Sequence, residues 1–442
     1  MTNPFTPTFG VTPPLLVGRG NVLDEFSLAL DGGVGDPARA MLLTGVRGAG
    51  KTVALNACED QAHRRGWAVI SETVRPGLVD ELTSSRLPEL LAEVADDATH
   101  SAVTAVNVMA AGFGGGVTRQ RSEKYPVNAS LRSQLTQLAD LYGARGGGVL
   151  VSLDEVHRAA TEDLRVIAHT IQHMFREGRP VAFIGAGPPA AIEHVLNDAV
   201  LTFLRRAERF TLGAVSYADV ELAIRTPIEN SGRKITDGAL AAAAGATQGY
   251  PFLVQLVGYQ MWSVAPDEPV ITEKQADFGI DRAVRRVGRL VHEPALGGLS
   301  DVDRAFLAAM ATDSGPSRIA DIAQRMGVNT TYAGQYRIRL MSAELITSAG
   351  HGLVRFELPY MREYLLSVAG ADEQQRPFGQ FTGKPGIPAL PTAPGRPSLP
   401  AADNSIPAKN ADLTSVQPEK DSSRMSTGIP ADSGTSHSTP VL

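Results

Sequence analysis

The 442-residue sequence contains a single cysteine, Cys58. One cysteine excludes a disulfide within the chain and a zinc site built from several cysteine ligands. No apolar run approaches the roughly 20 residues that a transmembrane helix needs. Residues 1–9 have neither the charged nor the apolar segment of a signal peptide. These absences predict a cytoplasmic protein with no membrane partner.

The sequence is also poor in aromatic residues, at 6%, and its net charge of −6 gives it no excess of positive charge. A chain of this sign is not drawn as a whole onto nucleic acid or anionic membranes. The apolar content of 43% is sufficient for hydrophobic cores. The length suits two or three domains.

One motif in the sequence indicates a specific kind of binding site. Residues 45–52 have the pattern G-x-x-x-x-G-K-T, preceded by an apolar strand at 40–43 and followed by a helical pattern. In a P-loop of this kind, glycines let main-chain N–H groups approach phosphate oxygens, and the helix N-terminus favours their negative charge. The predicted phosphate-binding residues are Gly45, Val46, Arg47, Gly48, Ala49, Gly50, Lys51 and Thr52.

A second motif supplies the carboxylates that a P-loop requires. The apolar strand at 149–153 ends in Asp154 and Glu155. We expect Lys51 to contact the β- and γ-phosphates of ATP, and Thr52 and Asp154 to hold Mg²⁺. Glu155 is the expected general base that activates water. This pair favours an ATPase over a kinase, and the sequence has no Asn-Lys-x-Asp motif of a GTPase.

The surrounding pattern predicts an α/β P-loop NTPase core with a parallel sheet over residues 16–214, after an extended arm at 1–15. Further core strands are expected at 67–71, 180–185 and 208–212. The glycine-rich residues 101–120 predict a hairpin inserted in this core, where a protein partner could bind.

Two smaller domains are expected after the core. Residues 215–296 alternate helical patterns with polar turns, as in a helical lid. Residues 297–370 have the order of a winged helix-turn-helix domain, with a third helix at 330–342 that carries Gln335 and Arg337. Residues 298–370 contain seven Arg, no Lys and seven Asp or Glu. Because this balance neutralises few phosphates, DNA binding and protein contact or nucleotide sensing both stay open.

The composition changes again at Ala371. Residues 371–442 hold 11 of the 29 prolines, and Phe378 and Phe381 are their only aromatic residues. Such a segment buries too little apolar surface to offset its ordering entropy. The sequence therefore predicts a disordered tail at 371–442 that tethers the protein or binds a protein partner.

Together, the P-loop, the Asp154-Glu155 pair and the order of domains resemble the AAA+ P-loop ATPases of the origin-recognition-like and STAND-type groups, over roughly residues 12–368. The resemblance implies that Gly18-Arg19 packs on the adenine and that Pro251, in Gly249-Tyr250-Pro251, lies near it. It also implies a homo-oligomer in which Arg206 or Arg205 reaches a neighbour's γ-phosphate. The alternatives are an ordinary loop at 18–19, a plain helix start at Pro251 and a surface salt bridge at the arginines.

Two positions depart from the family pattern. Gly20 stands where the family commonly has Glu, and Gly185, Ala186 and Gly187 supply no polar side chain at the end of the fourth strand. The resemblance implies a Mg²⁺-dependent ATPase that acts as a molecular switch and reorients its winged helix. The alternative is a slow or non-hydrolysing STAND-like regulator that gates DNA or protein contacts, and the missing polar side chain favours it.

Overall fold

The structure is a computed structural model that describes residues 2–8, 10–94, 130–156, 161–198 and 201–375. The hairpin predicted at 101–120 lies outside these residues, as does the predicted tail beyond residue 375. Helix α16 (Met361–Gln375) continues a few residues past Ala371, where the sequence predicts that the tail begins. Within the described part of the chain, no helix is both long and apolar enough to cross a membrane.

A five-stranded parallel sheet forms the centre of the first domain. Its order is β2-β3-β4-β1-β5, so β1, which precedes the P-loop, lies between β4 and β5. Helices cover both faces, which explains why β4 is buried along its whole length instead of alternating. The strands are β1 (Ala40–Thr44), β2 (Ala68–Thr73), β3 (Val149–Asp154), β4 (Val181–Gly187) and β5 (Glu208–Thr211).

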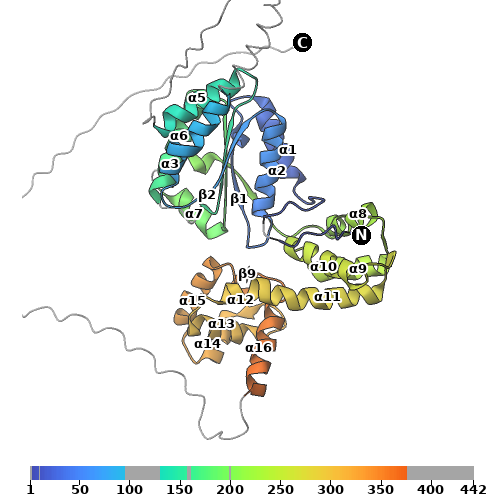
Figure 1. The fold of residues 1–442 in the computed structure, drawn as a ribbon. Helices are drawn as coiled ribbons and strands as arrows, with labels where there is room; N and C mark the ends of the chain where they lie inside the picture. Colours follow the sequence, from blue (N-terminus) through green and yellow to red (C-terminus); the bar gives the residue numbers. More distant parts are fainter. Residues whose placement is uncertain (1, 9, 95–129, 157–160, 199–200, 376–442) are drawn as a thin grey trace, which may run out of the picture. The chain divides into compact units, whose positions relative to one another are not determined.

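Two groups of helices pack on opposite faces of this sheet (Figure 1). One face carries α1 (Gly20–Gly32) and α2 (Lys51–Arg64). The other carries α3 (Leu78–Glu81), α5 (Leu131–Gly143), α6 (Thr161–Arg176) and α7 (Pro189–Asn197). The described core also contains short 3₁₀ turns at Pro37–Arg39 and Thr202–Arg206, a π-helical turn at Leu82–Arg86 and a helical segment at 87–94.

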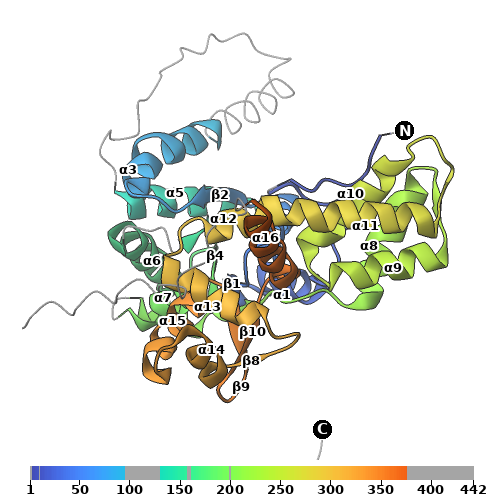
Figure 2. The same cartoon turned by 90° about the horizontal axis from the view of Figure 1, so that it is seen from below.

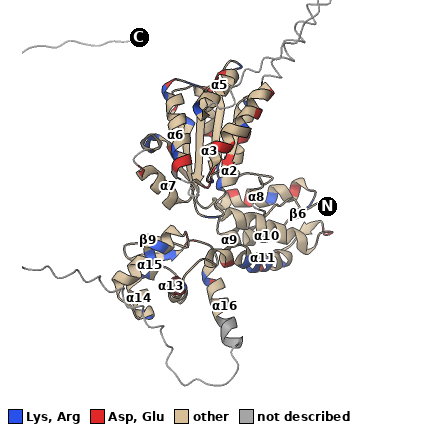
Figure 3. Ribbon diagram, turned by 60° about the vertical axis from the view of Figure 1, so that its left-hand side comes forward, with Lys and Arg blue, Asp and Glu red and all other residues tan. Residues whose placement is uncertain are grey.

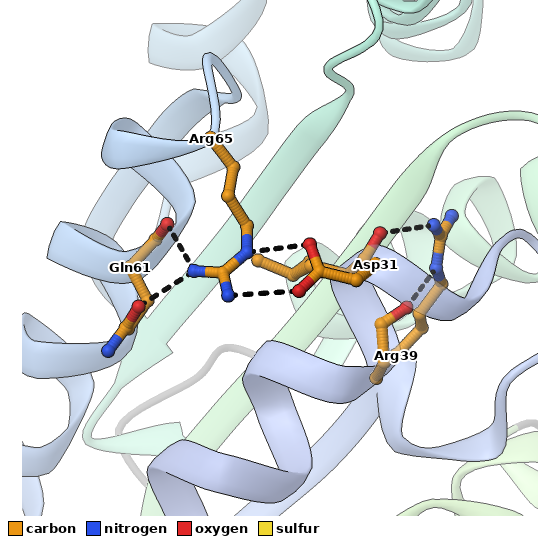
Figure 4. Close-up of polar contacts among 6 residues, drawn as sticks. Asp31, Arg39, Gln61 and Arg65 are labelled. Carbon is orange, nitrogen blue, oxygen red and sulfur yellow. Dashed lines mark hydrogen bonds and ion pairs between the residues drawn. The ribbon is translucent and has the colours of Figure 1, made fainter.

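Two arginines bind the end of α1, one from the end of the P-loop helix and one from the 3₁₀ turn before β1 (Figure 4). Arg65, just after α2, makes a bidentate ion pair with Asp31 of α1, at 2.8 and 3.0 Å. Arg39 is buried and donates to the Ala29 and Leu30 carbonyls near the end of α1. A bidentate guanidinium–carboxylate pair constrains geometry as well as distance. The Arg65–Asp31 pair therefore links the C-terminal end of α2 to α1.

A helical domain follows the sheet. Helices α9, α10 and α11 pack side by side, with α11 running along the other two (Figures 1 and 2). A two-stranded parallel sheet joins β6 to β7. The elements are α8 (Tyr217–Asn230), β6 (Lys234–Ile235), α9 (Asp237–Thr247), α10 (Pro251–Val264), β7 (Val270–Ile271), α11 (Glu273–Val287), a π-helical turn (Gly288–His292) and α12 (Glu293–Leu296).

The last described elements are helices and a small antiparallel sheet of order β8-β10-β9. They are α13 (Asp301–Ala311), β8 (Ser317–Arg318), α14 (Ile319–Met326), α15 (Thr330–Ser342), β9 (Ile346–Gly350), β10 (Leu353–Phe356) and α16. Their buried residues belong to the same hydrophobic cluster as those of the lid helices. His292 bonds the Pro359 carbonyl at 2.9 Å, and Tyr360 donates to the Ala246 carbonyl at 2.6 Å. The lid and the C-terminal elements therefore form one packed body.

The N-terminal arm joins this body to the sheet domain. Phe5 is only 2% exposed, and its ring packs on Gly258 of α10 so closely that a Cβ there would lie 2.4 Å from it. Asn3 donates to the Tyr259 carbonyl at 3.0 Å. Farther along the arm, Asn56 of α2 donates to the Gly10 carbonyl at 3.0 Å. The arm thus contacts lid helix α10 with one end and P-loop helix α2 with the other.

Candidate nucleotide-binding site

The chain between β1 and α2 has the backbone conformation of a phosphate loop. Gly48 and Gly50 have φ of +77° and +89°, values that glycine adopts without the cost a side chain would add. Gly45 has no room for a side chain, because a Cβ would lie 2.7 Å from the Leu212 carbonyl. The turn ends at Lys51, the first residue of α2. Its N–H groups and the helix N-terminus make a concave site for an anion.

Side chains at the end of β3 meet the start of α2. The Thr52 hydroxyl donates to the Asp154 carboxylate at 2.6 Å, and the Glu155 N–H donates to the other Asp154 oxygen at 2.8 Å. Glu155 has φ of +56°, an uncommon conformation for a residue with a side chain. Lys51 donates to the Gly45 and Val46 carbonyls at 2.6 and 3.2 Å. The four residues predicted to act on phosphate, metal and water therefore lie in one place.

The Thr52–Asp154 pair fits Mg²⁺ by its chemistry. Within the part of the chain that the structure describes, no group of three or more His, Cys, Asp or Glu could enclose a metal ion. Mg²⁺ prefers oxygen ligands, retains several waters and is typically held by one or two protein groups together with substrate phosphates. A hydroxyl and one carboxylate beside a P-loop match that requirement.

A cavity of about 800 Å³ opens at this point. Its polar end contains the P-loop and Glu155, and Leu15, Leu16 and Val17 line an apolar part. Pro251 at the start of α10 also lines it. Polar groups at one end of a mainly apolar cavity suit a ligand with phosphates and a planar base.

Arg19 lies beside this cavity as a buried side chain. Its guanidinium donates to the Ala49 and Gly213 carbonyls, both at 2.9 Å, and burial lowers its pKa. Gly18 has φ of +66° and lies against Val215. These bonds show that Arg19 fastens the P-loop to the chain after β5. Adenine contact by Gly18-Arg19 or Pro251 stays a prediction.

The remaining predicted residues lie away from the cavity. Arg205 donates to the Leu196 carbonyl at 2.8 Å, and Arg206 is exposed. Neither lines the cavity of its own chain, so an action on a neighbour's phosphate stays a prediction. At the end of β4, the buried Gly185, Ala186 and Gly187 offer only main-chain groups.

Tyr250 of the lid contacts the P-loop directly, a role that sequence reasoning missed. Its hydroxyl donates to the Arg47 carbonyl at 2.7 Å. A Cβ on Gly48 would lie 2.0 Å from the Tyr250 hydroxyl oxygen, so only glycine permits this approach. Burial raises the pKa of Tyr250, which keeps the hydroxyl protonated as a donor. The only signal was its position between Gly249 and Pro251.

Glu344, between α15 and β9, also reaches the P-loop and was not predicted. The Arg47 N–H donates to its carboxylate at 2.9 Å, and Glu344 has φ of +59°. Burial raises the pKa of this carboxyl group, Lys51 and the Arg47 N–H oppose the rise, and Glu155 adds to it. The carboxylate thus accepts from a P-loop N–H, a group that binds phosphate oxygen in P-loop proteins.

Comparison with known proteins agrees with this geometry. Residues 15–184 match the AAA ATPase domain family. The chain carries an AAA+ P-loop ATPase domain. Residues 289–365 match a family described as a domain of unknown function, DUF8462, and this match begins inside the π-helical turn after α11. A search of curated proteins found no match.

The fold of the AAA+ ATPase domain and the elements after it recur in solved structures. A Walker-type ATPase of Pyrococcus abyssi is 15% identical, with a TM-score of 0.55, over 79% of this chain and 96% of that one. The Aeropyrum pernix ORC2 protein, solved as ADPNP–ADP complexes, is 15% identical, with a TM-score of 0.53, over 83% of this chain and 98% of that one. At this identity the likeness concerns the fold alone. It extends past the AAA+ domain into the lid and C-terminal elements.

Proposed function

We propose that this chain is a Mg²⁺-dependent ATPase in which bound nucleotide repositions the body formed by the lid and the winged-helix elements. The observation that carries the ATPase part is the Thr52–Asp154 bond of 2.6 Å beside Glu155, at the carboxyl ends of β1 and β3. Ligands of open parallel sheets bind at this edge. The Aeropyrum pernix ORC2 protein was solved as ADPNP–ADP complexes, which supports the same ligand class.

Each residue has a defined task in this proposal. The P-loop N–H groups bind the phosphates, and Lys51 exchanges its loop carbonyls for the β- and γ-phosphates. Thr52 and Asp154 hold Mg²⁺, which neutralises charge on the phosphates. Glu155 accepts a proton from the attacking water. Arg206 or Arg205 of a neighbouring copy stabilises the transition state, which in P-loop enzymes contributes roughly 10³–10⁵ in rate.

The switch part rests on the two contacts from the lid and C-terminal body to the P-loop. A phosphate that binds the Arg47 N–H displaces the Glu344 carboxylate, because the two anions accept a hydrogen bond from the same N–H group. The Tyr250 hydroxyl donates to the carbonyl of Arg47. The lid and the C-terminal elements therefore both contact the P-loop at Arg47. Binding of ATP therefore moves this body relative to the sheet domain. The shifted winged helix is proposed to expose or withdraw a surface for DNA or for protein.

The proposal is tested by measuring Mg-ATP binding and phosphate release for the full chain and two variants. Lys51→Ala removes the charge that faces the phosphates and should weaken both. Glu155→Gln should keep binding and slow turnover by about 10²-fold or more, because it removes the general base. Unchanged affinity and turnover in Lys51→Ala would exclude the site.

A second candidate, the slow regulator, is favoured by one observation. The end of β4 carries no polar side chain to orient the attacking water. In this version ATP binds with the same residues and is retained. Tight Mg-ATP binding by the wild type without phosphate release, with the same Lys51→Ala defect, would establish the regulator instead of the enzyme.

A further inference from the structure

A basic groove on the lid lies apart from the nucleotide cavity. Six residues line it, and the cavity contains none of them. Four are arginines that recur at helical spacing in a stripe on one side of the chain. One is an exposed phenylalanine and one is a buried glutamine. They are Gln260, Phe278, Arg282, Arg285, Arg286 and Arg289.

The arginines concentrate positive charge in a domain that has no excess of it. Residues 215–296 contain eight Lys or Arg and ten Asp or Glu, yet residues 282–289 contain four Arg and no acid. Among the described residues, none of these four arginines makes an ion pair. At 1.5 Å per residue the stripe spans about 10 Å along the helix. Figure 3 shows blue segments, which mark Lys and Arg, along α11.

These arginines could instead stabilise the negative, C-terminal end of a helix dipole, but the backbone does not fit this explanation. α11 does not end at Val287, because helical turns continue without interruption through Gly288–His292 and α12. Cations stabilise a helix chiefly in its last turn. The stripe therefore lies within a continuous helical segment, where no terminal carbonyls need it.

Two other residues point to a ligand. Gln260 is 2% exposed as a residue and lines the groove with its amide side chain, which is not among the buried polar groups that lack a partner. Phe278 is 54% exposed, one turn before Arg282. An exposed aromatic ring beside guanidinium groups is the arrangement that stacks a base and binds its phosphates.

We propose that this groove binds a single-stranded nucleic acid, with the arginines on successive phosphates, Phe278 against a base and Gln260 hydrogen-bonded to that base or its sugar. A peptide of Asp and Glu would pair with the arginines but has no planar ring to stack on the exposed Phe278. This site is independent of the proposed ATPase chemistry and of helix α15.

The experiment measures fluorescence anisotropy of the full chain with an oligothymidylate of about 20 nucleotides, across a range of salt concentrations. Arg282→Gln with Arg286→Gln should lower the salt slope by about 1.4 and weaken binding near 0.1 M salt by about 25-fold, because each lost phosphate contact changes the slope by about 0.7. Phe278→Ala should weaken binding by about tenfold and leave the slope unchanged, since stacking releases no counterions.

A matched control removes two positive charges elsewhere in the lid. Lys234 and Lys274 are exposed and lie outside the groove, so Lys234→Gln with Lys274→Gln should bind as the wild type does. Lys51→Ala should also bind normally, which separates this site from the ATP site. No binding by the wild type, equal loss in the lysine control, or stronger binding of a polyglutamate peptide of equal length would overturn the proposal.

Discussion

The main-chain N–H of Arg47 has two competing acceptors in the proposed cycle, the Glu344 carboxylate and an ATP phosphate. Glu344→Gln removes the negative charge and leaves a weaker acceptor of similar size. Hydrogen bonds to charged groups contribute about 1.5–3 kcal/mol. We therefore expect Glu344→Gln to bind Mg-ATP roughly tenfold or more tightly than the wild type, as measured by calorimetry.

Asp321→Asn is the control for this prediction. It removes one charge from exposed helix α14, and its side chain does not line the nucleotide cavity. ATP affinity should not change in this variant. If Glu344→Gln binds ATP no better than Asp321→Asn does, the carboxylate does not compete with phosphate.

Among single residues, the sequence could predict those that contact residues nearby in the chain or at the end of a recognisable strand. The P-loop glycines and Lys51 belong to one short turn, and Asp154 with Glu155 follows a strand that must run parallel to β1. Glu344 could not be found in this way, because 297 positions separate it from Arg47 and no motif surrounds it. The same holds for Phe5, whose partner Gly258 is a helix residue with no local signature.

Among the elements, the N-terminal arm connects lid helix α10 to P-loop helix α2. Gly258→Ala places a methyl group where the Phe5 ring lies, although alanine is the better helix former by about 1 kcal/mol. Because the arm lines the nucleotide cavity, we expect both Gly258→Ala and Phe5→Ala to weaken ATP binding. Titrations of ATP would measure this.

A buried phenylalanine outside the cavity provides the comparison. Phe306→Ala creates a void in the C-terminal elements, where Phe306 is fully buried and far along the chain from the arm. Such a change costs about 3–5 kcal/mol of stability. Below its unfolding temperature this variant should bind ATP normally. Equal ATP affinity in all three variants would show that the arm is only a structural element.

The junction between the π-helical turn and the loop before α16 contains a buried histidine. Burial lowers the pKa of His292 to about 4, although its bond to Pro359 and the nearby Glu363 oppose this shift. Between pH 6.5 and 4 the unfolded chain binds a proton that the folded chain does not. The free energy of unfolding should therefore decrease by up to about 3 kcal/mol as pH falls through this range.

His292→Gln keeps an N–H donor for the Pro359 carbonyl and does not titrate. Urea unfolding at several pH values should show a smaller loss of stability in this variant across the same window. An identical pH profile in the two proteins would assign the pH dependence to other groups.

The pattern of apolar residues predicted helices and strands better than it predicted contacts between distant residues. The α/β core with a parallel sheet is confirmed, because continuously buried strands such as 149–153 leave a clear apolar pattern. The tail boundary at Ala371 stays a prediction, and helix α16, which begins at Met361, continues to Gln375 because a change in composition does not by itself end a helix. The π-helical turns were not predicted, because they depend on packing and not on local residue preference.

The buried apolar residues of the described chain form three hydrophobic clusters, which are distributed unequally among the domains. The sheet domain has its own two clusters, one on each face, while the lid and C-terminal elements share a third. Packed cores are dense and move as units. The body from α8 to α16 should therefore move as one piece when ATP displaces Glu344, with the change concentrated between it and the sheet domain.

Pairs of spin labels can measure this motion. The native Cys58 is buried, and burial raises its pKa to about 12, so labelling of introduced cysteines will be selective. Asp60, Lys274 and Asp321 are exposed positions on α2, α11 and α14, respectively. We expect Mg-ATP to change the distance between labels at 60 and 321 and to leave the distance between 274 and 321 constant.

The same labels in Lys51→Ala provide the reference, because this variant should not respond to ATP at either pair. Glu344→Gln should shift the pair at 60 and 321 toward the ATP-bound distance even without nucleotide, since the contact that holds the body against the P-loop is weakened. A change at 274 and 321 of the same size as that at 60 and 321 would mean that the shared core divides. The lid and the C-terminal elements would then move separately, and Glu344 could report nucleotide only to its own part.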